Sequence, residues 1–316
     1  MPSPALLAQR SAPADAFGAR FPFQLVALGI VFYATGPVLA RSSDTTGVLL
    51  SFWRLWFGAA AFALALLVHR LSGRSIGSAR GIRLAMLAGA VFSVNQVAFF
   101  TAVKRTSVVD VSLLGTLAPI LVALLAVPLF GERPGARFRW WSLLGIAGAA
   151  YIVLGSSSGP NGDLLGMLLG LLATAAFACF FVISKLAREE VPVVSFLTFV
   201  MATAAVCVSG YVVMLGSDPG SVESPDLWRA LGMALVPGAL GHIAMTWPLR
   251  HLPANVPPLF RLATPAVAGL FAWIFLGEGF TIVHVVGGAI IIAGLSGAIL
   301  SQAGRDLVAD ARRAAA

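Results

Sequence analysis

The chain has 316 residues, of which 59% are hydrophobic and only 11% are charged. Water-soluble globular proteins contain about 25% charged residues, so this composition excludes a soluble enzyme or binding module. A net charge of +8 would favour a nucleic-acid partner in a soluble protein. Here the charges lie in short segments between apolar runs, so we assign them to membrane topology and expect no nucleic-acid partner.

Apolar runs recur along the chain, most of them close to the roughly 20 residues that a helix needs to cross a bilayer. Residues 1–21 precede them as an Ala/Pro/Ser-rich segment that we predict to be a disordered cytoplasmic tail. Ten runs are predicted to be transmembrane helices: 22–40, 47–69, 84–103, 107–130, 140–155, 164–186, 194–215, 228–249, 254–277 and 283–301. Residues 302–316 form a second predicted tail. The expected fold class is an all-α integral membrane protein.

The fourth and ninth runs follow one pattern. Residues Val108–Glu132 and Ala254–Glu278 align at a shift of 146 positions, and each contains a central proline and ends in Gly-Glu. The shift pairs Pro119 with Pro265, Gly131 with Gly277 and Glu132 with Glu278. A proline inside a membrane helix removes a backbone hydrogen bond and kinks the helix. We therefore predict hinge or structural roles for these residues. For the two glutamates, pairing with a nearby arginine is favoured over a gating role.

Because five is an odd number of spans, the second copy must enter the membrane in the opposite sense. The sequence thus predicts two inverted five-helix repeats, residues 22–155 and 156–301, which can rock about a site near the bilayer midplane. With both termini in the cytoplasm, the inner segments contain 15 Lys and Arg residues and the outer segments 4. This asymmetry predicts cytoplasmic termini.

The Pro-x(11)-Gly-Glu ending of both runs, with the preceding segment Ala98–Pro119, resembles the EamA-type transporters of the drug/metabolite transporter superfamily. The resemblance implies a bacterial inner-membrane carrier, often an exporter of amino acids or other small metabolites, with a cavity between its halves. Its partners would be a small-molecule substrate and the lipid bilayer. We expect no cofactor, no metal and no enzymatic activity, and monomer and homodimer both stay open. A membrane channel or a non-transporting receptor is the alternative.

Arg261 is the first candidate for substrate binding, because a charged side chain inside a span is costly unless it faces a wet cavity or a partner. It lies in the ninth run, one turn before Pro265. A guanidinium group binds a carboxylate through two parallel hydrogen bonds. A structural arginine bonded to carbonyl groups near the kink is an equally weighted alternative. For Arg54, flanked by Trp53 and Trp56, we favour a side chain that reaches the membrane interface.

Other polar and aromatic residues could line the same cavity. His242 lies four residues before Thr246 and matches Gln96 in the repeat. Tyr33 and Phe99 could complete the pocket, although each such residue is more often helix-packing material. No acidic residue lies in the middle of a span, and Asp110 lies near the start of the fourth run. A carboxylate proton relay therefore has no candidate, which favours uncoupled or exchange transport.

Overall fold

The computed structural model describes the backbone of residues 22–130, 135–157, 163–241, 244 and 263–314, and within these ranges the side chains of 24–125, 135–156, 163–241, 244 and 263–301. Every regular element in these ranges is a helix. They are α3 (Pro22–Arg41), α4 (Gly47–Leu71), α5 (Ala79–Arg105), α6 (Val108–Gly115), α7 (Ala118–Phe130), α8 (Ala136–Ser157), α9 (Leu164–Arg188), α10 (Val193–Met214), η1 (Pro219–Ser221), α11 (Ser224–Met233), η2 (Ala234–Leu240), α14 (Thr264–Leu276) and α15 (Ile282–Ala314).

Within these ranges, eight helical segments are long and apolar enough to cross a membrane, and α14 is a shorter apolar helix. These eight segments correspond to the predicted runs between residues 22 and 215 and to the run 283–301, which are confirmed as helices. The predicted runs 228–249 and 254–277 are described in part, as α11, η2 and α14. Their remaining residues lie outside the described ranges. The chain is a multi-pass helical membrane protein.

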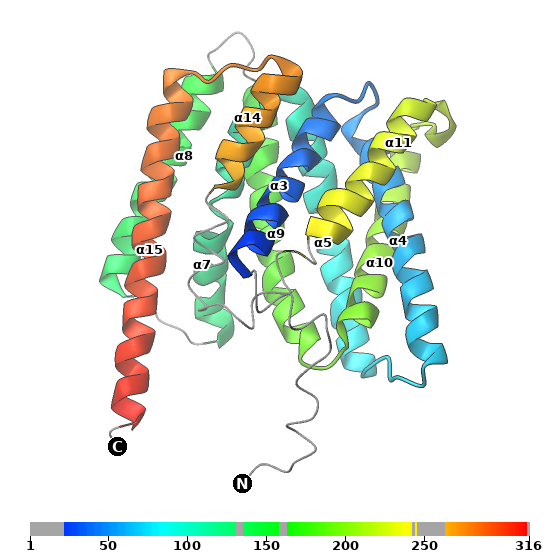
Figure 1. The fold of residues 1–316 in the computed structure, drawn as a ribbon, viewed down its shortest axis with the longest axis horizontal. Helices are drawn as coiled ribbons and strands as arrows, with labels where there is room; N and C mark the ends of the chain where they lie inside the picture. The colour runs from blue at the N-terminus through cyan, green and yellow to red at the C-terminus, as the bar shows by residue number, and fades with distance from the viewer. Residues whose placement is uncertain (1–21, 131–134, 158–162, 242–243, 245–262, 315–316) are drawn as a thin grey trace.

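Helices from the first half of the chain pack mainly against helices from the second half (Figure 1). At one side of the molecule α8 lies against α15, and at the other α4 lies against α10 and α11. Between them α3 contacts α14 and η2, α5 contacts α9 and α10, and α7 contacts α9.

Small residues allow α8 and α15 to approach closely. A Cβ atom placed on Gly294 of α15 would lie 2.7 Å from the Cα atom of Gly145 in α8, a separation at which something must shift. Glycine at such positions lets two membrane helices bring their backbones together and gain packing contacts. At Gly294 the α8–α15 contact is therefore between backbones, with no space for a side chain.

The predicted fourth span consists of two helices. Helix α6 begins at Val108 after the N-cap residue Ser107, whose Oγ atom accepts a hydrogen bond from the Asp110 N–H at 3.0 Å, and it ends at Gly115. Helix α7 resumes at Ala118, so Pro119 lies in the first helical turn, where its missing N–H removes no helix bond. Pro265 lies likewise in the first turn of α14. The break before Pro119 separates α6 from the rest of the span.

Candidate functional site

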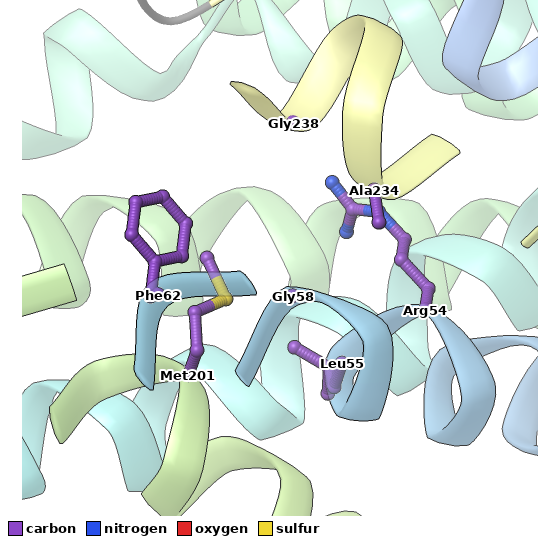
Figure 2. Close-up of a pocket in the computed structure, with 7 residues that line it drawn as sticks. All are labelled: Arg54, Leu55, Gly58, Phe62, Met201, Ala234 and Gly238. Atoms are coloured by element: carbon purple, nitrogen blue, oxygen red, sulfur yellow. The ribbon is translucent and has the colours of Figure 1, made fainter. Parts of the chain in front are cut away.

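Arg54 of α4 points into the helix bundle. Its Nε atom donates a hydrogen bond of 3.5 Å to the Met233 carbonyl, and its Cζ atom lies 5.3 Å from the centre of the Phe100 ring. An arginine over an aromatic face gains a cation–π attraction. In Figure 2 the side chain is directed towards Ala234 and Gly238. The prediction that Arg54 reaches the membrane interface is therefore wrong, because an aromatic face and a backbone carbonyl hold its guanidinium group inside the bundle.

The segment that receives Arg54 is a π-helix. Helix α11 widens at Met233 into η2, which contains Pro237. Proline lacks the N–H that an α-helix needs in its interior, and π-helical turns occur frequently at functional sites. A Cβ atom on Gly238 would lie 3.0 Å from the Met233 carbonyl oxygen and 4.0 Å from Nη2 of Arg54. The absence of a side chain at Gly238 thus leaves space beside the guanidinium group.

A small pocket opens at this contact between α4, α10 and η2 (Figure 2). Its lining residues are Arg54, Leu55, Gly58, Phe62, Met201, Ala234 and Gly238. Six of the seven are apolar or glycine, and Arg54 supplies the charge. In this conformation the pocket has room for little more than one water molecule, so it must widen to admit a substrate. Its chemistry, one fixed cation among apolar side chains, matches a small compound that carries both a negative group and a hydrophobic part.

Three predicted cavity residues, Tyr33, Gln96 and Phe99, are not among the residues that line this pocket. The ring of Tyr33 in α3 packs beside Gly241, since a Cβ atom added to that glycine would lie 3.7 Å from the tyrosine Cγ. Gln96 of α5 lies one helical turn before Phe100 and is buried. Phe99 is half-buried, stacks edge to face on Phe100 at 5.3 Å between ring centres, and packs in the core. Tyr33 and Gln96 therefore lie on helices around the Arg54 pocket, and Phe99 contributes to the core.

Among the residues that the structure describes, Gln96 has an unused hydrogen-bond acceptor. Its Nε2 atom donates to Oδ1 of Asn95 at 2.8 Å, and Asn95 in turn donates to the Ala173 carbonyl of α9 at 2.8 Å. The Oε1 atom of Gln96 is buried and has no hydrogen-bond partner within the described ranges. Leaving such an atom unpaired costs about 1–3 kcal/mol. Asn95 is thus committed to helix packing, and Gln96 keeps an acceptor that a ligand could use.

Five other predicted site residues lie outside the described residues: Arg261, His242, Thr246, Gly131 and Glu132. Their roles stay predictions.

Glu278 has long-range partners. Gly277 ends α14 with φ 70°, a left-handed conformation that glycine adopts without steric cost. Beyond this turn, Oε1 of Glu278 lies 3.2 Å from Nε of Arg41, and Oε2 accepts a hydrogen bond from the Val108 N–H at 2.9 Å. Local pairing, which the sequence favoured, is therefore wrong for Glu278. This part of the molecule is called the Glu278 end. It comprises the ends of α3, α5 and α14 and the starts of α4, α6 and α15.

A second carboxylate holds the α3–α4 connection at the Glu278 end. Oδ2 of Asp226, in α11, accepts hydrogen bonds from the N–H groups of Asp44 at 3.0 Å and Thr45 at 2.8 Å. Oδ1 of Asp226 pairs with Arg229 at 2.5 Å. The side chain of Arg41 also donates to the Lys104 carbonyl at 2.6 Å. Carboxylates of the second half of the chain thus bind backbone and arginine of the first half.

Comparisons with known proteins agree with this architecture. The sequence model of the EamA-like transporter family matches the chain twice, over residues 21–154 and 164–300. An uncharacterized transporter of Archaeoglobus fulgidus is 29% identical over 85% of this chain and 93% of its own length. The uncharacterized transporter YwfM of Bacillus subtilis is 28% identical over 83% and 87%. The aromatic amino acid exporter YddG of Ancylobacter novellus is 27% identical over 66% and 73%.

A solved crystal structure shares the fold, with a TM-score of 0.58 and 21% identity over 87% of this chain and 97% of the other. These findings confirm the resemblance that the two Pro-x(11)-Gly-Glu segments indicated. The two family matches together cover most of the sequence, and the chain therefore belongs to the EamA-like transporter family.

Proposed function

We propose that this protein is a secondary transporter that moves an amino acid or a related zwitterionic or anionic compound across the bacterial inner membrane by alternating access, as an exporter or exchanger. The observation that carries the substrate class is the single cation, Arg54, in an otherwise apolar pocket inside the bundle. A relative whose name is aromatic amino acid exporter supports the same class. A channel or a non-transporting receptor is the alternative.

The proposed architecture is ten membrane helices in two inverted five-helix repeats. The two matches of one family model support the repeat, and α3 and α9 both end in Leu-Ala-Arg, at residues 39–41 and 186–188. The contacts between helices also support the repeat. When each helix is replaced by the corresponding helix of the other half, the contacts it makes have counterparts. The contact between α3 and α14 corresponds to the contact between α9 and α7. The contact between α5 and α9 corresponds to the contact between η2 and α3.

In the proposed binding mode, the guanidinium group of Arg54 binds the substrate carboxylate, since its planar donors fit two carboxylate oxygens. The apolar wall formed by Leu55, Phe62 and Met201 receives the substrate side chain. The free Oε1 atom of Gln96 is suited to accept a hydrogen bond from the substrate ammonium group. Tyr33, His242, Thr246 and Arg261 are proposed to complete the cavity in other stages of the cycle.

The proposed orientation places both termini in the cytoplasm and the Glu278 end outside, following the distribution of Lys and Arg. Contacts at the Glu278 end then close the outer side of the carrier. Alternating access requires that these contacts break when the outer side opens.

Counterflow in proteoliposomes tests the proposed function. Liposomes containing purified protein are loaded with one unlabelled compound from a pool of amino acids and small organic anions, and uptake of the same labelled compound is followed. A carrier shows uptake that the internal compound stimulates. Proteoliposomes without the internal compound are the control. Unstimulated flux that continues down the gradient would instead indicate a channel. Binding without flux would indicate a receptor.

A further inference from the structure

A buried acid and a buried histidine meet at the Glu278 end. Asp110 of α6 and His284 of α15 are 2% and 7% exposed, and Nε2 of His284 lies 3.1 Å from Oδ1 of Asp110. The two residues are 174 positions apart in the chain. Ionisable residues inside membrane spans are rare, and they mark proton relays and ion pathways. This pair has no part in the pocket around Arg54.

The hydrogen bonds of His284 define its protonation state. The Nδ1 atom accepts a hydrogen bond from the backbone N–H of Thr281 at 3.0 Å, so Nδ1 carries a lone pair. Nε2 therefore carries the proton and donates to Asp110, because the bond at one ring nitrogen fixes the state of the other. The imidazole is neutral in this arrangement, and an ionised Asp110 accepts the hydrogen bonds from His284, Ser107 and Thr106. The pair holds one net negative charge in the interior.

The other oxygen of Asp110, Oδ2, has hydrogen-bond partners that suit both the ionised and the protonated carboxyl group. Oδ2 accepts a hydrogen bond from Ser107 at 2.6 Å and from Thr106 at 3.2 Å. A hydroxyl group both donates and accepts, so Thr106 can turn to accept a hydrogen bond from a protonated Oδ2. The Thr106 hydroxyl has a second possible acceptor in the Met167 sulfur, 4.0 Å away. A proton can therefore bind Asp110 without leaving a buried polar atom unpaired.

The charged groups on the surrounding helices are engaged elsewhere. Arg41 at the end of α3 pairs with Glu278 of the α14–α15 connection. Arg105 at the end of α5 pairs with Asp163, which precedes α9, at 2.5 Å. Lys104 donates to the Ser43 carbonyl. Within the described ranges, Arg41 and Arg105 are paired with carboxylates and Lys104 with a backbone carbonyl, and His284 is the ionisable side chain that contacts Asp110.

We propose that Asp110 and His284 form a proton-binding site that couples proton movement to the transport cycle. The inference rests on the proposed function. A proton from the outer solution binds Oδ2 of Asp110 and cancels the charge that strengthens the bond to His284. Because that bond joins α6 to α15 beside the Glu278 contact with Val108, protonation loosens the outer closure. The proton leaves to the inner solution in the alternate state, and a substrate molecule moves in exchange.

The expectation of uncoupled transport is thus replaced by proton exchange in this proposal. Sequence inspection missed the pair because Asp110 and His284 each lie near the end of a predicted span. Helix packing brings them together and shields both from solvent.

The test uses proteoliposomes and labelled L-phenylalanine as the first probe, with other members of the amino acid pool if it shows no counterflow. Two quantities are compared: counterflow at equal pH, and accumulation driven by a pH gradient. Wild type is expected to show both. Asp110→Asn should keep the rate of counterflow within about threefold of the wild-type rate. It should lower the accumulation driven by the pH gradient at least tenfold. Asp163→Asn, the control carboxylate near α9, should keep both. Driven accumulation retained in Asp110→Asn overturns the proposal.

His284→Gln is the second variant, with the same expected result, in case Asp110→Asn does not fold. A third measurement needs only wild type: a pH-sensitive dye inside the liposomes reports proton flux during substrate efflux. Substrate counterflow without any proton flux overturns the coupling and leaves the proposed transport function intact. No counterflow with any pool member contradicts the proposed function itself.

Discussion

Arg41 and Glu278 form an ion pair of 3.2 Å across 237 positions of the chain. It connects the end of α3, in the first half, with the turn that follows α14, in the second half. The second oxygen of Glu278 accepts the first free N–H of α6, at Val108, where a carboxylate is also favoured by the helix dipole. One side chain thus holds three helix ends together at the Glu278 end.

Glu278→Gln should open this end more often. The ion pair is partly exposed, so its loss should cost about 1 kcal/mol and shift the conformational equilibrium about fivefold. The shift is measured as a faster reaction of Ala234→Cys, in the pocket, with a membrane-impermeant maleimide added outside, after Cys179 and Cys207 are replaced. The charge exchange Arg41→Glu with Glu278→Arg should restore the slow rate only in part, because an arginine at position 278 cannot accept the hydrogen bond from the Val108 N–H and a glutamate at position 41 cannot donate to the Lys104 carbonyl.

The matched control for that experiment is Glu190→Gln. Glu190 pairs with Arg80 at 3.4 Å, between the start of α5 and the α9–α10 connection, which lie away from the Glu278 end. It should not accelerate labelling from outside. An unchanged labelling rate in Glu278→Gln would show that the pair does not restrain opening.

Arg54→Met should reduce counterflow by about tenfold or more. Hydrogen bonds to charged groups contribute about 1.5–3 kcal/mol, and about 1.4 kcal/mol corresponds to tenfold in binding. Arg54→Lys keeps the charge but not the planar set of donors, so an intermediate rate is expected. Arg83→Met, at an exposed position of α5, is the control. Normal transport by Arg54→Met with an unchanged melting temperature would remove Arg54 from the site.

Arg261→Ala should abolish flux of anionic and zwitterionic substrates while leaving the protein folded. This expectation rests on the substrate-binding interpretation of Arg261 at its predicted position inside a span, where an arginine costs about 2.5–3.5 kcal/mol at the helix centre. Uptake and the elution profile of the purified variant are measured together. Unchanged transport would leave Arg261 with a structural role only.

Pro119→Ala and Pro265→Ala should slow the transport cycle more than they weaken binding. Each proline begins a helix, α7 or α14, and proline restricts the preceding backbone as well as its own. Proline reduces backbone freedom by about 0.4–1 kcal/mol relative to other residues, and a barrier that rises by this amount slows the cycle about two- to fivefold. Counterflow rate and substrate affinity are measured separately. A selective loss of affinity would contradict a hinge role.

Gly294→Leu should destabilise the protein, because its side chain has no space against Gly145 of α8. Overpacking of this kind costs about 1–3 kcal/mol. Gly210→Leu in α10 is the control, since a Cβ atom there meets nothing within 4 Å. Thermal unfolding in detergent reports the difference. Equal melting temperatures would mean that α8 and α15 can separate at little cost.

Much of the helical architecture could be predicted from apolar length and from the repeated proline and Gly-Glu. Local chemistry determines these features: a membrane helix satisfies its own backbone, and glycine at position 277 allows the left-handed turn that ends α14. The break in the fourth span was also visible as Pro119. Such signals are contained within a few neighbouring residues.

The partners of the polar residues could not be predicted in the same way. Whether Arg54 reaches the interface or the interior depends on the rotation of α4 and on the position of Met233, 179 positions away. Glu278 and Asp110 likewise bind residues from the opposite half of the chain. The Pro237-Gly238 pair inside an apolar run was the available signal for η2, because an interior proline disrupts an α-helix.

The π-helix η2 also makes the two halves of the protein unequal. At the repeat shift of 146, residues 234–240 correspond to 88–94, which form regular α-helix within α5. A carrier with identical halves would have inward-facing and outward-facing forms of equal free energy. A widened turn in one half removes this degeneracy, and a difference of about 1.4 kcal/mol suffices for a tenfold preference. In the proposed inverted repeat, this irregularity is one of the differences between the halves that set the resting orientation of the carrier.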